Sequence, residues 1–359
     1  MKIKGLLSLV AVIAALILFS ENGECRPADT VALLSRSGEM ELEATRSGND
    51  IDFRLAPTRG NGQALCFKLS RLFPLSLEKP WALRPREFES LSLDADSAGM
   101  KIVCADGIME TKVAFAFQGQ LLRLDVRWEC IASSPVENAS VAVAFDLDHD
   151  PSTERVTMPH ILYNNNPSAD PARLVPHFGK ETSACLLCEE TRFPVPCVNV
   201  EWLRDGAPSV VSLFSLPQGD SREWSLGCDR GGVGGGTRII IASGILALNG
   251  QKDITYGGQC KAVPHDSGYL RLKKGDVLRK SCVINFGRAE RVGWGFRKII
   301  SSGYQILRPR TYPVLDIDRV IDLKANALDN RWHSDAKSSG FLSVLPDNYF
   351  KRPPYYLFG

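Results

Sequence analysis

Between about residue 30 and residue 290 the chain repeatedly alternates polar with apolar residues. Residues 120–128 read QLLRLDVRW, and residues 140–147 read SVAVAFDL. Successive side chains of a β-strand point to opposite faces, so this alternation places one face of each strand against a core. The chain also holds 30 glycines and 21 prolines, many of them at turn-like positions between such runs. We therefore predict a mostly β fold in which antiparallel sheets pack face to face as a β-sandwich.

The pattern changes near Gly293, where apolar residues begin to recur at helical spacing. Between residues 316 and 332 they fall near one helix face, and Asp316 and Asp318 suit the positive end of the helix dipole. The last residues, PPYYLFG, are apolar and aromatic, which indicates a chain that stops inside a domain. We expect a β-sandwich domain at 26–290, a linker helix at 291–314 and the start of a truncated helical domain at 315–359.

The N-terminus has the order of a secretory signal peptide. Lys2 and Lys4 precede an uncharged apolar run of 15 residues, and a polar stretch follows it. That run is short for a membrane span, which needs about 20 residues. We expect a signal peptide at 1–25, with a signal anchor as the alternative. The mature protein would then be secreted or periplasmic, with no integral membrane association after signal removal.

The ten cysteines can be interpreted in two ways. Their number fits an oxidising compartment, where disulfides persist. Several of them, such as Cys104 and Cys282, lie in strand-like runs, which is equally typical of buried thiols that pack as small apolar groups.

The charges are nearly balanced. The chain has 43 Lys and Arg against 41 Asp and Glu, for a formal charge of +2, so no bulk charge attracts nucleic acid or an anionic membrane. Apolar residues make up 44% and charged residues 23%, as in ordinary globular proteins rather than disordered ones. We expect no nucleic-acid partner.

Three aspartates at alternate positions, Asp146, Asp148 and Asp150, are the candidate metal ligands. In an extended segment their side chains share one face, and calcium binds several carboxylate oxygens at once. The alternative is a strand that ends in a solvated acidic loop. We expect no other cofactor, because the glycine-rich segment 231–236 fits neither dinucleotide-binding nor phosphate-loop spacing.

One stretch in the middle of the chain is rich in the residue types that bind sugars. Flat aromatic faces bind the C–H faces of a sugar, and planar amides, carboxylates and guanidinium groups match its hydroxyls. The alternative is an ordinary asparagine-rich turn beside a core tryptophan. The candidate substrate-binding residues are Tyr163, Asn164, Asn165, Arg192 and Trp202.

Residues 158–171, 200–202 and 256–261 resemble a group of secreted bacterial glycoside-hydrolase-like proteins. In such proteins a galactose-mutarotase-like β-supersandwich is followed by a linker helix and an (α/α)6 toroid. The resemblance covers most of the chain at the level of architecture. It implies a carbohydrate partner and an activity among glycoside hydrolases, phosphorylases or polysaccharide lyases. It also implies that the catalytic acids lie mainly on toroid loops, beyond the last residue of this chain.

Three functions are therefore open. The first is the N-terminal part of an exported carbohydrate-active enzyme, a glycoside hydrolase or polysaccharide lyase, whose sandwich supports and lines a sugar-binding cleft. The second is a non-catalytic carbohydrate-binding or structural module. The third is a mutarotase-like epimerase, in which Glu201 with His177 or His160 supplies the base and the acid that ring opening needs.

Overall fold

The computed structural model divides the chain into two compact units, Met1–Leu307 and Arg308–Gly359. The predicted signal peptide at 1–25 lies outside the described residues. Within those residues, no helix is both long enough and apolar enough to cross a membrane. The described residues are 30–48, 50–59, 64–70, 74–76, 90–96, 98–165, 186–218, 224–243, 247–249, 270–309, 316–334 and 339–341.

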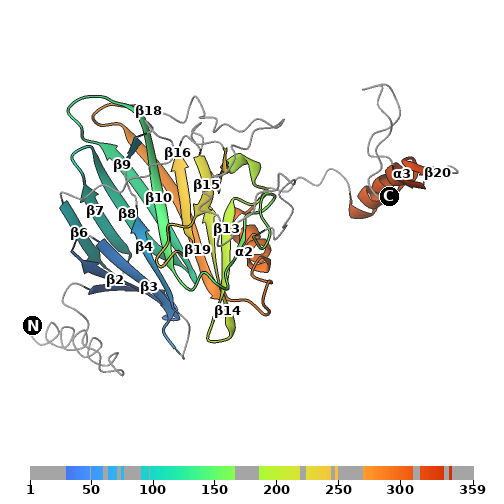
Figure 1. Cartoon of the computed structure of the whole chain (residues 1–359), viewed down its shortest axis with the longest axis horizontal. Helices are drawn as coiled ribbons and strands as arrows, with labels where there is room; N and C mark the ends of the chain where they lie inside the picture. Colours follow the sequence, from blue (N-terminus) through green and yellow to red (C-terminus); the bar gives the residue numbers. More distant parts are fainter. Residues whose placement is uncertain are drawn as a thin grey trace, which may run out of the picture. The chain divides into compact units, whose positions relative to one another are not determined.

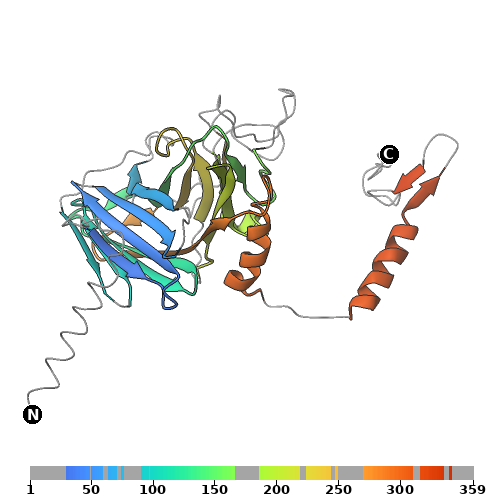
Figure 2. The same ribbon diagram turned by 90° about the horizontal axis from the view of Figure 1, so that it is seen from below.

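Two antiparallel sheets pack face to face in the first unit (Figures 1 and 2), which confirms the predicted β-sandwich. The larger sheet has the described order β1-β2-β3-β4-β10-β16-β15-β12-β17, and β5 and β18 also pair with β10. Its strands are β1 (Thr30–Leu34), β2 (Met40–Ser47), β3 (Asp50–Pro57), β4 (Leu65–Ser70), β5 (Pro74–Ser76), β10 (Val136–Asp148), β12 (Leu186–Glu189), β15 (Trp224–Asp229), β16 (Arg238–Ser243), β17 (Ala247–Asn249) and β18 (Leu270–Leu272).

The smaller sheet has the described order β11-β13-β14-β19-β9-β8-β7-β6. Neighbouring strands are joined by long antiparallel registers, such as the one that pairs β8 with β9 from Met109↔Cys130 to Gln118↔Leu121. Its strands are β6 (Ser90–Ala95), β7 (Met100–Ala105), β8 (Met109–Gln118), β9 (Leu121–Cys130), β11 (Arg155–Thr157), β13 (Cys197–Arg204), β14 (Ala207–Ser215) and β19 (Val277–Arg288).

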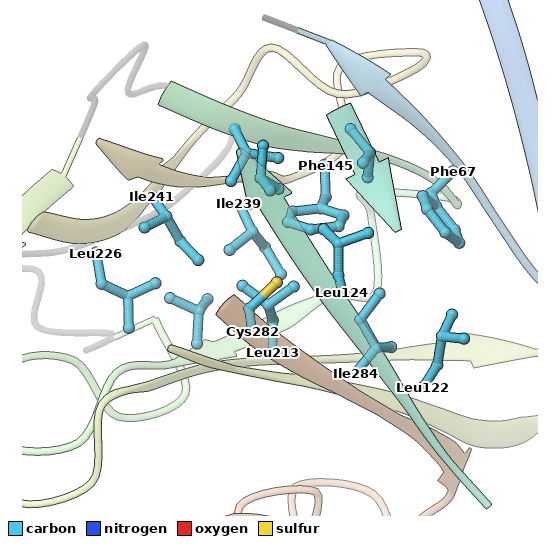
Figure 3. Packing of buried hydrophobic residues seen from close by; sticks show 14 of the residues in the cluster. Phe67, Leu122, Leu124, Phe145, Leu213, Leu226, Ile239, Ile241, Cys282 and Ile284 are labelled. Atoms are coloured by element: carbon cyan, nitrogen blue, oxygen red, sulfur yellow. The ribbon is translucent and has the colours of Figure 1, made fainter. Parts of the chain in front are cut away.

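The core lies between the inner faces of the two sheets. Leu122 and Leu124 on β9 belong to one buried cluster with Phe145 on β10 and with Ile239 and Ile241 on β16, and all five are at most 1% exposed (Figure 3). Leu122, Leu124 and Phe145 lie in the strands that the sequence predicts at 120–128 and 140–147. Burying each such side chain stabilises the fold by about 1.5–3 kcal/mol relative to leaving it exposed.

None of the seven cysteines that the structure describes forms a disulfide. Six are buried, and Cys66 is half-buried. Burial raises the pKa of Cys104 to about 12 and that of Cys188 to about 11, so these thiols stay protonated. They pack as small apolar groups, which is the second of the two readings of the sequence. Three cysteines, Cys25, Cys185 and Cys260, lie outside the described residues.

Helix α2 (Arg297–Leu307) packs on the outer face of the smaller sheet through its buried side chain Ile299 (Figure 1). Polar contacts add to this packing. Asn199 Nδ2 donates to Ser212 Oγ at 2.8 Å and to the Gly295 carbonyl at 3.3 Å, and Asn285 Nδ2 donates to Ser302 Oγ at 2.5 Å. The sheet therefore holds both α2 and the turn that leads into it.

The second unit contains helix α3 (Ile317–Asp329), with strands β20 (Trp332–Ser334) and β21 (Ser339–Phe341) after it. Asp316 caps the helix, because its carboxylate accepts the Arg319 amide N–H at 2.9 Å. The helix begins where the sequence predicts it and ends before Trp332.

We expect an alanine at position 295 to disturb the packing of α2 on the smaller sheet. A Cβ there would lie 2.8 Å from Glu201 Oε2 and 3.0 Å from Val210 Cγ2, both of which belong to the sheet. We expect Gly295→Ala to lower the free energy of unfolding by about 1–3 kcal/mol, measured by urea denaturation. Gly287→Ala is the matched control, because its Cβ would meet only the flexible end of Lys298 at 3.6 Å. Equal losses in the two variants would contradict this account.

Candidate functional site

Residues 158–165, which we call the asparagine turn, fold back on β11 in a constrained backbone conformation. His160, Asn164 and Asn165 have φ values of 76°, 46° and 66°. This left-handed region is uncommon for residues other than glycine, although Asn and His enter it more readily than most. Strained backbone of this kind is maintained only when the surrounding structure determines it, and it is frequent at functional sites.

Side-chain hydrogen bonds and two buried anchors hold the asparagine turn in place. Asn165 Oδ1 accepts the Val156 amide N–H at 2.7 Å, and Asn165 Nδ2 donates to the Glu154 carbonyl at 2.9 Å. Met158 and Leu162 are fully buried in the main core. The turn is therefore rigidly attached to the end of the sandwich.

Two predicted substrate-binding side chains of this turn face the solvent. Tyr163 is 56% exposed, and its hydroxyl accepts the His160 amide N–H at 2.9 Å. Asn164 is exposed, and within the described residues its side-chain amide has no hydrogen-bond partner. Two consecutive residues of the turn thus expose an aromatic ring and a planar amide.

Glu201 is only 2% exposed, and the backbone occupies both of its carboxylate oxygens. The Gly293 and Gly295 amide N–H groups donate to Oε1 and Oε2 at 2.5 and 2.6 Å, and Arg155 Nη1 lies 4.0 Å from Oε1. Two such hydrogen bonds compensate the burial of a carboxylate. This occupancy gives Glu201 a positioning role, because it holds residues 293–295 beside the asparagine turn. Asn164 Nδ2 lies 4.0 Å from the position of a Cβ on Gly293.

The other predicted residues are placed elsewhere or lie outside the described part. Trp202 is 3% exposed, and its ring lies 4.9 Å from that of His149 and 6.3 Å from that of Phe286, so it packs in the core. Arg192 ends the short helix η1 (Glu190–Arg192), where its Nε donates to Glu189 at 3.0 Å. His177 lies outside the described residues.

The three aspartates do not converge on one point. Asp146 forms an ion pair with Arg238 on β16, and Asp150 accepts the Ser152 amide N–H at 2.8 Å. Asp148 is exposed, and its carboxylate makes no hydrogen bond or ion pair with any described residue. Among the described residues, no group of three or more His, Cys, Asp or Glu side chains is arranged to hold a metal ion.

A buried charged network lies beneath the asparagine turn, and the sequence reasoning missed it. Glu154 Oε2 accepts from Thr237 Oγ1 at 2.9 Å and lies 2.7 Å from His149 Nε2, while Glu154 Oε1 forms an ion pair with Arg230. The His149 and Glu154 side chains are at most 1% exposed. His149 and Glu154 lie in the connection from β10 to β11, whereas Arg230 and Thr237 lie in the connection from β15 to β16, so no local motif signals the network.

The network keeps His149 neutral. Burial and the positive charge of Arg230 lower the pKa of His149 to about 4. Because Arg230 already neutralises Glu154, the histidine can remain an uncharged partner of that carboxylate.

Comparison with known proteins identifies no family for this sequence: no family model and no curated protein matches it. Several solved structures are similar at low levels. A galactose mutarotase related enzyme from Lactobacillus acidophilus is 12% identical, with a TM-score of 0.35, over 70% of this chain and 99% of that one. A TPR-domain containing protein from Parabacteroides distasonis is 10% identical, with a TM-score of 0.33, over 83% of this chain and 56% of that one.

A glycoside hydrolase family 97 enzyme from a Pseudoalteromonas species, solved in complex with acarbose, is 11% identical with a TM-score of 0.32. The similarity covers 72% of this chain and 35% of the enzyme, so this chain spans about a third of its length.

Removal of the Glu154 charge tests the buried network. We expect Glu154→Gln to lower the free energy of unfolding by about 3–5 kcal/mol, because it leaves the Arg230 charge buried without its partner. The control is Glu43→Gln, which removes the same kind of pair with Arg54 on the surface, where the side chains are 22% and 50% exposed. That change should cost less than about 1 kcal/mol in the same urea titration. Similar losses for both variants would show that the buried pair of Glu154 with Arg230 stabilises the fold no more than a surface ion pair does.

The neutral state of His149 predicts how stability depends on pH. The unfolded chain binds a proton on this histidine near its ordinary pKa of 6.5, whereas the folded chain does so only near 4. The unfolded state therefore holds more protons in this window, so the contribution of His149 to stability is present above pH 6.5 and is lost as the pH falls toward 4.

His149→Gln preserves a donor for Glu154 but cannot titrate. Urea unfolding of both proteins at half-unit steps from pH 7 to pH 4 should give a steeper loss for the native chain. Parallel curves would contradict the assigned state of His149.

Proposed function

We propose that the asparagine turn binds carbohydrate, and that this chain is the sugar-facing N-terminal part of an exported carbohydrate-active enzyme, a glycoside hydrolase or polysaccharide lyase. The observation that carries the proposal is that consecutive residues of the asparagine turn, Tyr163 and Asn164, expose an aromatic ring and a planar amide. A sugar ring offers an apolar C–H face and a rim of hydroxyls. The aromatic face suits the first, and an amide that can both donate and accept hydrogen bonds suits the second.

The rigidity of the turn supports a binding role. A flexible loop loses conformational freedom when it binds a ligand, whereas a preorganised one does not. Here the left-handed residues, the Asn165 hydrogen bonds and the buried Met158 and Leu162 fix the backbone before any ligand arrives. Binding residues are characteristically carried on loops that a rigid scaffold positions. The turn and the sandwich below it fit this arrangement.

Two other functions would use the same surface. A non-catalytic binding module needs only Tyr163 and Asn164. A mutarotase-like epimerase needs an acid and a base as well, and the Gly293 and Gly295 amides already occupy both oxygens of its candidate base Glu201. The geometry therefore favours sugar binding over proton transfer at this surface.

The proposal of export rests on the basic start and the apolar run of residues 1–25.

Binding of neutral sugars is the test. We would titrate the protein with galactose, glucose, maltotetraose, cellotetraose and mannotetraose by calorimetry. We expect at least one of these sugars to bind, and Tyr163→Ala to weaken its binding by about tenfold, equivalent to about 1.4 kcal/mol. Tyr163→Phe keeps the ring and should retain most of the affinity. Tyr304→Ala is the matched control, because Tyr304 is a 66% exposed tyrosine on α2.

The outcomes separate the three functions. Turnover of an oligosaccharide by a longer form of the chain supports the enzyme. Tight binding without turnover supports the module, and interconversion of galactose anomers supports the epimerase. If none of the five sugars binds, or if Tyr304→Ala weakens binding as much as Tyr163→Ala does, the asparagine turn is not a carbohydrate site.

A further inference from the structure

A second candidate site lies on the outer face of the larger sheet. A half-open cavity of about 290 Å³ is formed by β2, β3, β4 and the end of β10, and Val233 of the glycine-rich segment 231–236 contributes to its wall. Its volume is near the lower end of the range of roughly 300–1,000 Å³ that small-molecule sites occupy. The cavity therefore suits a molecule of about the size of a single sugar. It belongs to a different sheet from β11, on which the asparagine turn folds back.

The strand registers arrange the lining of this cavity in two rows that run across the strands. In the first row Asp52 on β3 stands opposite Lys68 on β4, which stands opposite Asp146 on β10, and Asp146 stands opposite Arg238 on β16. Lys68 Nζ lies 3.0 Å from Asp52 Oδ1, and Arg238 forms an ion pair with Asp146. Negative and positive charges alternate along this row, and they balance.

The second row lacks one positive charge. Glu43 stands opposite Arg54, Arg54 opposite Cys66, and Cys66 opposite Asp148. Arg54 Nη1 lies 3.2 Å from Glu43 Oε2, so that pair is internally balanced. At the β4 position where the first row has Lys68, the second has an uncharged cysteine. The Asp148 carboxylate consequently has no partner among the described residues.

The electrostatics of the two rows agree with this difference. A hydrogen bond from Lys68 to Asp52 raises the pKa of Lys68, and the charges of Asp52, Asp50 and Asp146 act in the same direction. Burial raises the pKa of the Cys66 thiol, so this side chain adds no charge to the row. Of the charges around the thiol, Arg204 and Arg54 lower its pKa, and Asp148 and Asp52 raise it. Among the residues that line the cavity, three carboxylates, those of Glu43, Asp52 and Asp148, stand against two cations, Arg54 and Lys68.

We propose that this cavity binds the protonated amine of a compact polar molecule, with the ammonium group against Asp148 above Cys66. A bound ammonium group would complete the second row as Lys68 completes the first. Amino sugars and short aliphatic diamines both carry this group, and the polar lining from Glu43 and Thr45 can accept or donate hydrogen bonds at the rest of the ligand. A neutral sugar lacks the charge, and a sugar acid would be repelled by Asp148.

The test is a titration of the isotopically labelled full chain, followed by NMR chemical shifts, with glucosamine, putrescine, glucose and glucuronate. We expect glucosamine and putrescine to shift resonances of β3, β4 and β10 at concentrations where glucose and glucuronate do not. Tighter binding of glucosamine identifies an amino sugar as the ligand class, and tighter binding of putrescine identifies a diamine. The affinity should fall at 0.5 M salt, since a half-open site is screened.

Variants locate the interaction on Asp148. Asp148→Asn should weaken amine binding by about tenfold, as expected for the loss of a charged hydrogen-bond acceptor. Asp150→Asn is the matched control, because Asp150 is an exposed aspartate two residues away that is engaged with Ser152. Cys66→Lys supplies the missing cation from the chain itself and should abolish amine binding while the protein stays folded by circular dichroism.

Several results would overturn the proposal. These are shifts of the β3, β4 and β10 resonances by glucose at concentrations as low as those needed for glucosamine, no loss of these amine-induced shifts in Asp148→Asn, or an equal loss in Asp150→Asn. Tyr163→Ala should leave amine binding intact, so a failure of the carbohydrate site on the asparagine turn can be told apart from a failure here.

Discussion

The register of strand β10 is the constraint on which the larger sheet depends. This strand lies inside the sheet and pairs with β4 on one side and with β16 on the other. Its register sends Val143 and Phe145 into the core and Asp146 and Asp148 to the outer face. Since side chains alternate with a period of two, a slip of one residue would bury two carboxylates and expose two apolar groups. The hydrophobic core therefore also fixes the positions of the charged residues around the outer cavity.

Two buried carboxylates show how the sandwich stabilises the loops at its end. Backbone amides of the segment before α2 compensate Glu201, whereas side chains compensate Glu154. A buried charge without partners is costly, so each carboxylate constrains the segments that supply its partners. The asparagine turn bonds to the backbone of Glu154 and lies near the segment that Glu201 holds. The rigidity of the proposed sugar-binding surface thus depends on two polar contacts that no sugar touches.

Sequence patterns predict the parts of this fold that depend on neighbours along the chain. The alternation in β9 and β10 and the acidic start of α3 are local signals, and the structure confirms the strands and the helix. Trp202 illustrates the limit. Strand β13 is buried on both faces because α2 covers its outer side, so the alternation disappears and the sequence alone does not distinguish a core tryptophan from an exposed one. The pairing of Glu154 with Arg230 depends on strand order, which residue spacing does not encode.

The buried cysteines make it possible to follow how the strands of the sandwich separate during unfolding. The six buried cysteines among the described residues are spread over β7, β9, β12, β13, β15 and β19, so both sheets carry them. A buried, protonated thiol does not react with an alkylating reagent until its strand separates. Alkylation followed by mass spectrometry of each peptide would therefore give the order in which the strands separate, in the unaltered protein and without an introduced probe. Because the fold protects these sulfur atoms, the alkylation rate of each one reports the local unfolding of its strand.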